Sequence, residues 1–185
     1  MYMNIPNVLT IGRLIGAPVF FFVFRYGGKE GVIVAFIVYI ILEISDALDG
    51  IIARKTKTIT NFGKLADPLA DKICLLSYLM AINEIDLIPG WMFLLIFYRE
   101  FIVTLIRMLS LTKGKVIPAM VSGKIKKTVQ VISIFTVLLL LILQKSYPFI
   151  AVNKISLYII GFMTLITVIS GIEYITKGIK VIEFK

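Results

Sequence analysis

The sequence predicts an all-α integral membrane protein with six transmembrane helices, cytoplasmic N- and C-termini and a short interfacial segment at the N-terminus. Of its 185 residues, 59% are hydrophobic and only 17% are charged, and the mean hydropathy is +0.97. A soluble domain of this length contains roughly 45–50% apolar and about 25% charged residues. The excess of apolar side chains is too large for one small core, so lipid must solvate much of the surface. We expect a single membrane domain over residues 1–185.

Six stretches are apolar over a length that can cross a bilayer, which takes about 20 residues in a helix. They cover residues 7–25, 30–53, 66–84, 88–111, 121–144 and 153–176. Turn-forming residues separate these stretches at 27–28, 83–86 and 148 on one side of the membrane, and at 55–63 and 113–118 on the other. The opening residues 1–12 are less apolar and are expected to lie along the interface before the first helix.

The basic residues predict the orientation of these helices. Most of the 20 lysines and arginines fall on the side of the membrane that also carries both termini, and such a side is normally cytoplasmic. We therefore expect a multi-pass protein of the inner membrane with its active site facing the cytoplasm. The net charge of +9 could also suggest nucleic acid, but the basic residues lie between apolar runs, so we expect no nucleic-acid partner.

Two residue types narrow the possible chemistry. The chain contains no histidine and one cysteine, Cys74. The lack of histidine excludes histidine general bases and most zinc sites. A single cysteine excludes a disulfide within the chain.

Four aspartates interrupt the apolar pattern at the adjoining ends of the second and third predicted helices. Asp46 and Asp49 are three residues apart and Asp67 and Asp71 are four apart, so each pair shares one face of its helix. The short basic loop between these helices makes them antiparallel neighbours, and both acidic faces should meet near the cytoplasmic ends. An aspartate within the membrane costs about 2.5–3.5 kcal/mol even on lenient scales. The four carboxylates therefore require a compensating positive charge.

Carboxylates that converge without histidine or cysteine form an oxygen site typical of Mg²⁺, Mn²⁺ or Ca²⁺. A site of this charge could hold two cations, which suits the attacking and leaving oxygens of a phosphoryl-type displacement. Gly50 and Ala53 leave room on the same face for a flat base or a pyrophosphate. The alternative is that the aspartates cap helices or pair with Arg54, Lys64 and Lys72. That interpretation suits any one aspartate better than it suits all four.

Residues 46–71 read D-A-L-D-G-I-I-A-R-K-T-K-T-I-T-N-F-G-K-L-A-D-P-L-A-D. This stretch resembles the signature of the CDP-alcohol phosphotransferase family, D-x2-D-G-x2-A-R-x8-G-x3-D-x3-D, at every fixed position. The resemblance implies a six-helix membrane fold, usually a homodimer, whose metal site opens to the cytoplasm. It also implies two Mg²⁺ (or Mn²⁺) ions per site that clamp the donor's pyrophosphate, held by Asp46, Asp49, Asp67 and Asp71.

The same resemblance implies roles in the reaction. Asp71 would be the general base that takes the proton from the acceptor hydroxyl, whose oxygen attacks the phosphorus bearing the lipid while CMP departs. Space for the cytidine would come from Gly50 and Ala53. The full set of predicted CDP-lipid-binding residues is Asp49, Gly50, Ala53, Arg54, Gly63, Asn7 and Thr10, and Arg13 is a further hypothetical contact of the nucleotide or its phosphates.

Three stretches outside the signature resemble the phosphatidylglycerophosphate synthase branch of the family. They are N-I-P-N-V-L-T-I-G-R at 4–13, Y-R-E-F-I-V-T-L-I-R at 98–107 and G-K-I-K-K-T-V-Q at 123–130. The second stretch ends in T-L-I-R at 104–107 where the family more commonly has S-G-L-R, so it lacks that glycine. This resemblance implies that the acceptor is sn-glycerol 3-phosphate and that the products are phosphatidylglycerophosphate and CMP.

An anionic acceptor requires cations near the metal site, and arginine suits phosphate because of its forked donors. The predicted acceptor-binding residues are Arg99, Arg107, Lys124 and Lys126. The alternative is that Arg99 pairs with Glu100 or Glu43 and that the lysines are ordinary cytoplasmic residues. Two other functions stay open: the same transfer from CDP-diacylglycerol to inositol phosphate, serine or another alcohol, and a divalent-cation transporter. The transporter is disfavoured because the aspartates cluster at one end of their helices.

Overall fold

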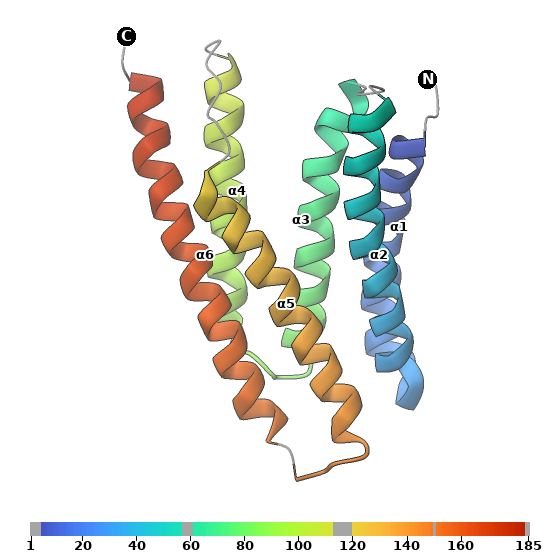
Figure 1. Ribbon diagram of the computed structural model, residues 1–185. Helices are drawn as coiled ribbons and strands as arrows, with labels where there is room; N and C mark the ends of the chain where they lie inside the picture. Colours follow the sequence, from blue (N-terminus) through green and yellow to red (C-terminus); the bar gives the residue numbers. More distant parts are fainter. Residues whose placement is uncertain (1–4, 57–60, 113–119, 150, 184–185) are drawn as a thin grey trace. The chain divides into compact units, whose positions relative to one another are not determined.

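The computed structural model contains only α-helices as regular secondary structure in the residues that it describes (Figure 1). These are residues 5–56, 61–112, 120–149 and 151–183, with side chains described for all but 5, 29, 53–56, 61–62, 64–65, 111–112 and 179–183. The helices are α1 (Ile5–Tyr26), α2 (Gly28–Thr56), α3 (Asn61–Glu84), α4 (Gly90–Thr112), α5 (Val121–Gln144) and α6 (Val152–Glu183). The predicted all-α class is therefore confirmed.

The helix boundaries lie close to the predicted ones, with three differences. Helix α3 begins at Asn61 rather than residue 66, and α6 continues to Glu183 rather than ending at 176. The opening residues from Ile5 form the first turns of α1 instead of a separate segment. Pro6 is compatible with this because the first N–H groups of a helix have no partner within it.

Within the part of the chain that the structure describes, four helices are long and apolar enough to cross a membrane, by length and composition. These candidate spans are Pro6–Tyr26, Glu30–Ile52, Val121–Gln144 and Val152–Gly178. Helices α3 and α4 differ because charged residues interrupt their apolar sequence, as Asp71 and Lys72 do in α3 and Arg99 and Glu100 in α4. The six-span count and the cytoplasmic termini stay predictions.

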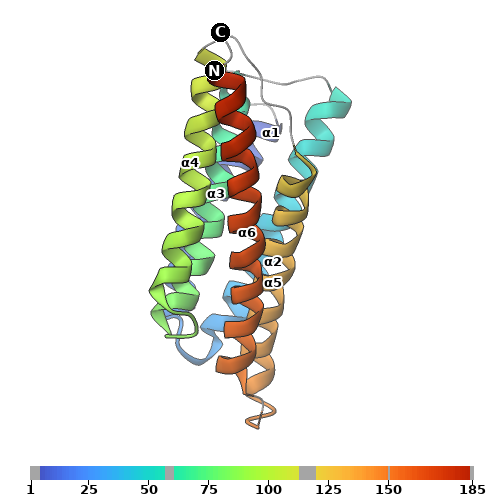
Figure 2. The same cartoon turned by 90° about the vertical axis from the view of Figure 1, so that its left-hand side faces the viewer.

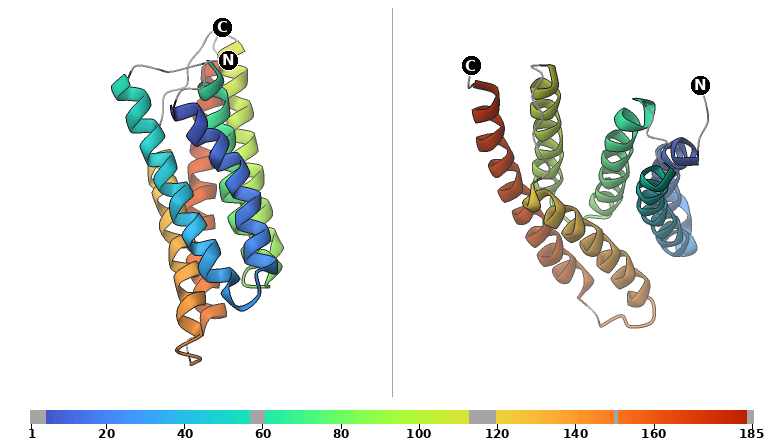
Figure 3. Two further views of the ribbon diagram at one scale, coloured as in Figure 1. Left: turned by 90° about the vertical axis from the view of Figure 1, so that its right-hand side faces the viewer. Right: turned by 45° about the horizontal axis from the view of Figure 1, so that its top comes forward.

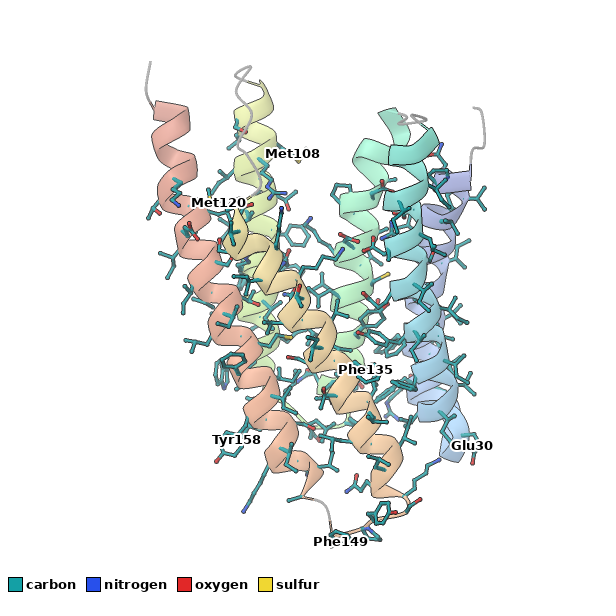
Figure 4. The ribbon with its side chains drawn as sticks, in the orientation of Figure 1. Glu30, Met108, Met120, Phe135, Phe149 and Tyr158 are labelled. Carbon is teal, nitrogen blue, oxygen red and sulfur yellow. The ribbon has the colours of Figure 1, made fainter. Side chains whose placement is uncertain are left out.

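One exposed face of α6 is strongly apolar, as lipid contact requires. Its exposed side chains recur every three or four residues, at Tyr158, Phe162, Leu165, Ile169 and Ile172. This spacing places them on one stripe of the helix. Figure 4 labels Tyr158, whose ring points away from α6. The polar residues Ser156, Thr164, Thr167 and Ser170 of the same helix are buried instead.

The chain divides into two compact units, each of which is described by itself. The first comprises Met1–Ile85 and Leu138–Pro148, and the second comprises Asp86–Val137 and Phe149–Lys185. In the first unit, α1 packs against both α2 and α3 (Figure 3). In the second, α4 packs against α6 (Figure 2). The prediction of one domain over the whole chain stays a prediction.

A close turn joins α1 to α2 at the predicted Gly27-Gly28 position. Gly28 has a φ of 62°, in the left-handed region that glycine enters without a steric penalty. Three residues later, a Cβ on Gly31 would lie 2.6 Å from the backbone oxygen of Val23. The turn therefore depends on the absence of a side chain at Gly31, where the two helices start to diverge.

We expect Gly31→Ala to lower the free energy of unfolding by about 1–3 kcal/mol, because the new methyl group would clash with backbone that cannot yield. Thermal unfolding in detergent measures this. Gly12→Ala is the matched control, because nothing lies within 4 Å of a Cβ built there. That variant should be neutral or slightly stabilised. Equal melting temperatures for the two variants would show that the close turn does not constrain Gly31.

Candidate active site

The four aspartates surround a single guanidinium group within the first unit. Arg13, on α1, is 1% exposed, and its Nη1 donates hydrogen bonds to Asp46 Oδ1 and, at 2.8 Å, to Asp71 Oδ1. Its Nη2 donates to Asp49 Oδ2 at 2.5 Å and lies 3.6 Å from Asp67 Oδ1. Carboxylates from α2 and α3 thus converge on one positive charge from α1. We call these five residues the aspartate–arginine cluster.

An aromatic core sets the register of the three helices that carry this cluster. The ring of Tyr78, on α3, lies 4.7 Å from that of Phe20, on α1, and 4.9 Å from that of Tyr39, on α2, in edge-to-face geometry. Such pairs contribute about 0.5–1.5 kcal/mol each beyond burial. Packing of these three rings fixes the axial position of each helix relative to the other two.

The cluster lies at a constant spacing from that core. Arg13 precedes Phe20, Asp46 follows Tyr39 and Asp71 precedes Tyr78 by the same number of residues, about two helical turns in each case. Because α2 runs antiparallel to α1 and α3 (Figure 1), these offsets place the three charged side chains at the same height along the helix axes, on one side of the aromatic core. The aromatic packing therefore positions the charged groups.

The N-terminal half of α1 presents a polar face to the same cluster. Asn7, Thr10 and Arg13 are all buried and lie three residues apart, on one side of the helix. Thr10 Oγ1 donates to Asp67 Oδ1 at 2.5 Å and contacts the backbone oxygen of Pro6 at 3.0 Å. The structure thus brings Thr10 and Arg13 to the aspartates, and Asn7 is buried one turn earlier on the same face.

The four aspartate side chains differ in how much of their surface is exposed. The side chain of Asp49 is 7% exposed, whereas those of Asp67 and Asp71 are 44% and 39% exposed. Asp46 lies between, at 24%. The cluster is therefore closed at Asp49 and open on the α3 side, where a substrate can approach Asp67 and Asp71.

The donor set fits a hard divalent cation, because it consists of carboxylate oxygens from two adjoining helices. As the described residues are placed, no three acidic or cysteine side chains are grouped around a common metal position. Their spacing is instead adapted to the guanidinium of Arg13, which supplies the compensating charge. A metal ion at this site would be held by the carboxylates of Asp46, Asp49, Asp67 and Asp71.

The remaining predicted nucleotide-site residues lie beside this cluster in the chain. Gly50 is half-buried next to Asp49, and Gly63 is buried in the first turn of α3. Ala53 and Arg54 lie in the last turns of α2, and their side chains fall outside the described ones, as does that of Lys64. Lys72, considered above as a partner of the aspartates, donates to the backbone oxygen of Pro68 at 3.0 Å.

Arg13 has a role that its sequence context alone does not indicate, because the structure makes it the partner of all four aspartates. Its contact with the nucleotide or its phosphates stays a prediction. A signal for a polar partner was present in the spacing of Asn7, Thr10 and Arg13, which places three polar side chains on one face of an apolar helix. That face had to be buried against something polar.

The second unit contains a buried ionic group that includes two of the predicted acceptor-site cations. Glu100 Oε1 accepts hydrogen bonds from Arg99 Nη1 at 3.0 Å and from Lys126 Nζ at 2.6 Å. Arg99 Nη2 also donates to Ser170 Oγ at 2.8 Å. All four residues are buried. The alternative in which Arg99 pairs with Glu100 is therefore what the structure contains, and this group links α4, α5 and α6.

The other two predicted acceptor-site cations are exposed. Arg107 Nη2 donates to the phenol oxygen of Tyr174 at 2.6 Å. Among the described residues, neither Arg107 nor Lys124 forms an ion pair with a carboxylate. The positive charge of these two residues therefore remains available to an anion, whereas Arg99 and Lys126 share the carboxylate of Glu100.

Comparison with known proteins identifies the family to which this arrangement belongs. Residues 3–170 match the family model described as CDP-alcohol phosphatidyltransferase. The chain is 37% identical to the CDP-diacylglycerol–glycerol-3-phosphate 3-phosphatidyltransferase of Bacillus subtilis (strain 168), with 95% of each chain covered. It is 34% identical to a "Probable phosphatidylglycerophosphate synthase" of Mycobacterium tuberculosis (strain H37Rv), with 96% of this chain and 82% of the relative covered.

A third relative extends the comparison to another bacterial group. The CDP-diacylglycerol–glycerol-3-phosphate 3-phosphatidyltransferase of Rickettsia bellii is 33% identical, with 92% of this chain and 93% of the relative covered. The family match spans most of the chain and includes α1, the aspartates of α2 and α3, and the cations of α4 and α5. The chain belongs to the CDP-alcohol phosphatidyltransferase family.

Proposed function

We propose that this protein transfers the phosphatidyl group of CDP-diacylglycerol to sn-glycerol 3-phosphate and releases phosphatidylglycerophosphate and CMP. The observation that carries this proposal is the convergence of Asp46, Asp49, Asp67 and Asp71 on one point between α1, α2 and α3. The names of the relatives from Bacillus subtilis and Rickettsia bellii support the same donor and acceptor.

The four aspartates would hold Mg²⁺ or Mn²⁺, with two ions per site. Bound metal would neutralise charge on the donor's pyrophosphate and on the departing CMP. The closed end of the cluster at Asp49 and the open end at Asp67 and Asp71 suggest that the donor enters from the α3 side. Gly50, Ala53, Arg54 and Gly63 would then border its cytidine, and Asn7 and Thr10 its phosphates.

Asp71 would act as the general base that takes the proton from the acceptor hydroxyl. Its carboxylate is partly exposed, so an acceptor hydroxyl can reach it. In the cluster it lies with three other carboxylates around Arg13, whose Nη1 donates to Asp71 Oδ1 at 2.8 Å. Arg13 would hold the aspartates in a convergent arrangement and limit their mutual repulsion.

The acceptor's phosphate would bind Arg107 and Lys124, whose charges no described carboxylate neutralises. Arg99 and Lys126 were also predicted to bind the acceptor. Through their ion pairs with Glu100 they would contribute indirectly, by holding α4, α5 and α6 together. A neutral acceptor would offer no anionic group for Arg107 and Lys124 to bind. This favours glycerol 3-phosphate over serine.

We propose that the protein crosses the inner membrane six times, with both termini and the active site on the cytoplasmic side, and that it functions as a homodimer. Of the charged interruptions in α3 and α4, Asp71 belongs to the aspartate–arginine cluster, and Arg99 and Glu100 belong to the buried group that also contains Lys126, which is compatible with spanning. Intramembrane charges normally face protein or a water-filled cavity rather than lipid.

Replacing Arg107 with alanine should raise the KM for glycerol 3-phosphate by about tenfold or more, because a charge-assisted hydrogen bond to phosphate contributes roughly 1.5–3 kcal/mol. The KM for CDP-diacylglycerol should change by less than about twofold, since Arg107 would not contact the donor. Initial rates of CMP release in detergent, with each substrate varied in turn, measure both constants.

Arg25→Ala is the matched control for this experiment. Arg25 is an arginine at the end of α1 whose Nε lies 3.6 Å from Glu84 Oε2, with both side chains substantially exposed. Its removal should leave both KM values unchanged. Equal increases in the donor and acceptor KM for the Arg107 variant would contradict the assignment of Arg107 to the acceptor's phosphate.

A further inference from the structure

Tyr174 is a buried tyrosine of the second unit. It lies on α6, is 1% exposed and packs with Val103, Ile106 and Met120. Tyrosine rings at this depth usually have a hydrogen-bond partner for the hydroxyl group. In Tyr174 that group makes two polar contacts, and one of them is with Arg107.

The phenol oxygen of Tyr174 accepts two hydrogen bonds from different parts of the chain. Arg107 Nη2, on α4, donates at 2.6 Å, and the backbone N–H of Met120 donates at 3.0 Å. Figure 4 labels Met120 immediately before α5. A hydroxyl oxygen has two acceptor lone pairs, so both are used. Tyr174 thereby fixes Arg107 relative to the start of α5.

The ring of Tyr174 restrains Arg107 as well. The guanidinium carbon of Arg107 lies 4.9 Å from the ring centroid, and that of Arg99 lies 5.9 Å away. These distances fall within the range of cation–π attraction. The two arginines differ in what else they contact, because Arg99 also bonds to Glu100 and Ser170. For Arg107, Tyr174 is the described side chain that holds the guanidinium.

An arginine held in this way binds phosphate at a lower entropic cost. A free arginine side chain has roughly 2 kcal/mol of rotamer entropy to lose on binding, and fixing it beforehand improves affinity without adding a contact to the ligand. Guanidinium has five N–H donors, and the bond to Tyr174 uses one of them. The remaining N–H groups can donate to a phosphate as a forked pair.

We propose that Tyr174 is a positioning residue that orients Arg107 toward the acceptor's phosphate and so favours a phosphorylated acceptor over a neutral alcohol. This inference rests on the proposed function, in which Arg107 binds glycerol 3-phosphate. Tyr174 itself does not contact substrate. Its effect on the reaction passes through Arg107.

Tyr174→Phe tests this role, because phenylalanine retains the ring and removes the acceptor oxygen. The KM for glycerol 3-phosphate should rise by about tenfold, while kcat and the KM for CDP-diacylglycerol should change by less than about twofold. Tyr158→Phe is the matched control on the same helix, since Tyr158 is 77% exposed. That substitution should change none of the three constants.

A double-mutant cycle separates positioning from a merely structural role. Adding Tyr174→Phe to Arg107→Ala should produce no further increase in the acceptor KM, because the residue through which Tyr174 acts is already absent. A tenfold increase in that background as well would overturn the proposal. A Tyr174→Phe protein with a lower kcat and both KM values raised would also overturn it, because that pattern indicates general distortion.

Gly123→Ala provides an independent variant that leaves the hydroxyl group in place. A Cβ at Gly123 would lie 3.2 Å from both Cε2 and the phenol oxygen of Tyr174, so it would displace the ring. The acceptor KM should rise by a few fold, and only while Arg107 is present. If Arg107→Ala alone leaves the acceptor KM unchanged while CMP is still released, the assignment of Arg107 fails and the transfer reaction stands.

Discussion

Replacing Asp71 with asparagine should lower the rate of CMP release by at least about a thousandfold. General-base catalysis alone contributes typically 10²–10⁴-fold, and Asp71 would also hold metal. Asparagine preserves the shape of the side chain but cannot take a proton. The measurement is the initial rate of CMP release by purified protein in detergent, with saturating CDP-diacylglycerol, glycerol 3-phosphate and Mg²⁺.

Asp86→Asn is the matched control for this substitution. Asp86 is exposed, lies between α3 and α4 and has a φ of 57°, a left-handed conformation that asparagine tolerates well. The same chemical change outside the aspartate–arginine cluster should leave the rate unchanged. An Asp71→Asn protein that is folded and retains more than a tenth of the rate would exclude Asp71 as the general base.

Replacing Arg13 with glutamine should destabilise the protein strongly when divalent metal is removed. Arg13 is the shared partner of four carboxylates, and removing one side of a buried ion pair costs about 3–5 kcal/mol. For a chain of this size that corresponds to a fall in Tm of roughly 6–20 °C. Adding Mg²⁺ should recover much of this loss, because metal ions would supply the positive charge that Arg13 no longer provides. Thermal unfolding in EDTA and in Mg²⁺ measures both effects.

Two further variants define what Arg13 contributes. Arg13→Lys retains the charge but loses the forked donors, so its Tm in EDTA should lie between those of the wild type and Arg13→Gln. Arg25→Gln removes an exposed arginine from the same helix and should change Tm little. An Arg13→Gln protein that unfolds at the wild-type temperature in EDTA would show that Arg13 does not balance the charge of the aspartates.

The aspartates could be predicted as a group because their signal is local. Asp46 and Asp49 share a helix face by spacing alone, as do Asp67 and Asp71, and the short connection between their helices leaves few arrangements. The structure brings all four to one point. Their roles in metal binding and catalysis stay predictions. The partner of the group was not predictable in the same way.

The partners of Arg13 could not be predicted because they are separated from it in sequence and lie on two other helices. Whether α1 packs against α2, α3 or both depends on tertiary packing, here on the rings of Phe20, Tyr39 and Tyr78. Spacing along α1 indicates only that Asn7, Thr10 and Arg13 share a face. It does not identify the surface that covers this face.

The second unit shows a different limit of sequence reasoning. Arg99 and Glu100 are adjacent in sequence, and neighbouring residues on a helix do not face one another, so their ion pair depends on how their long side chains bend. Lys126 and Ser170 complete the group from two other helices. Tyr174 has no local signal at all, since it is one aromatic residue in a long apolar helix. Its importance appears only when its contacts with Arg107 and Met120 are known.

The most direct test of the central claim is CMP release by the purified protein with CDP-diacylglycerol and Mg²⁺, measured with glycerol 3-phosphate, inositol phosphate and serine as separate acceptors. The proposed function predicts CMP release that requires glycerol 3-phosphate, forms phosphatidylglycerophosphate in equal amount and stops when EDTA removes the metal. Release that requires one of the other acceptors instead would contradict the assignment of glycerol 3-phosphate. No release with any acceptor, from protein that unfolds cooperatively and is saturated with Mg²⁺, would contradict phosphatidyl transfer itself.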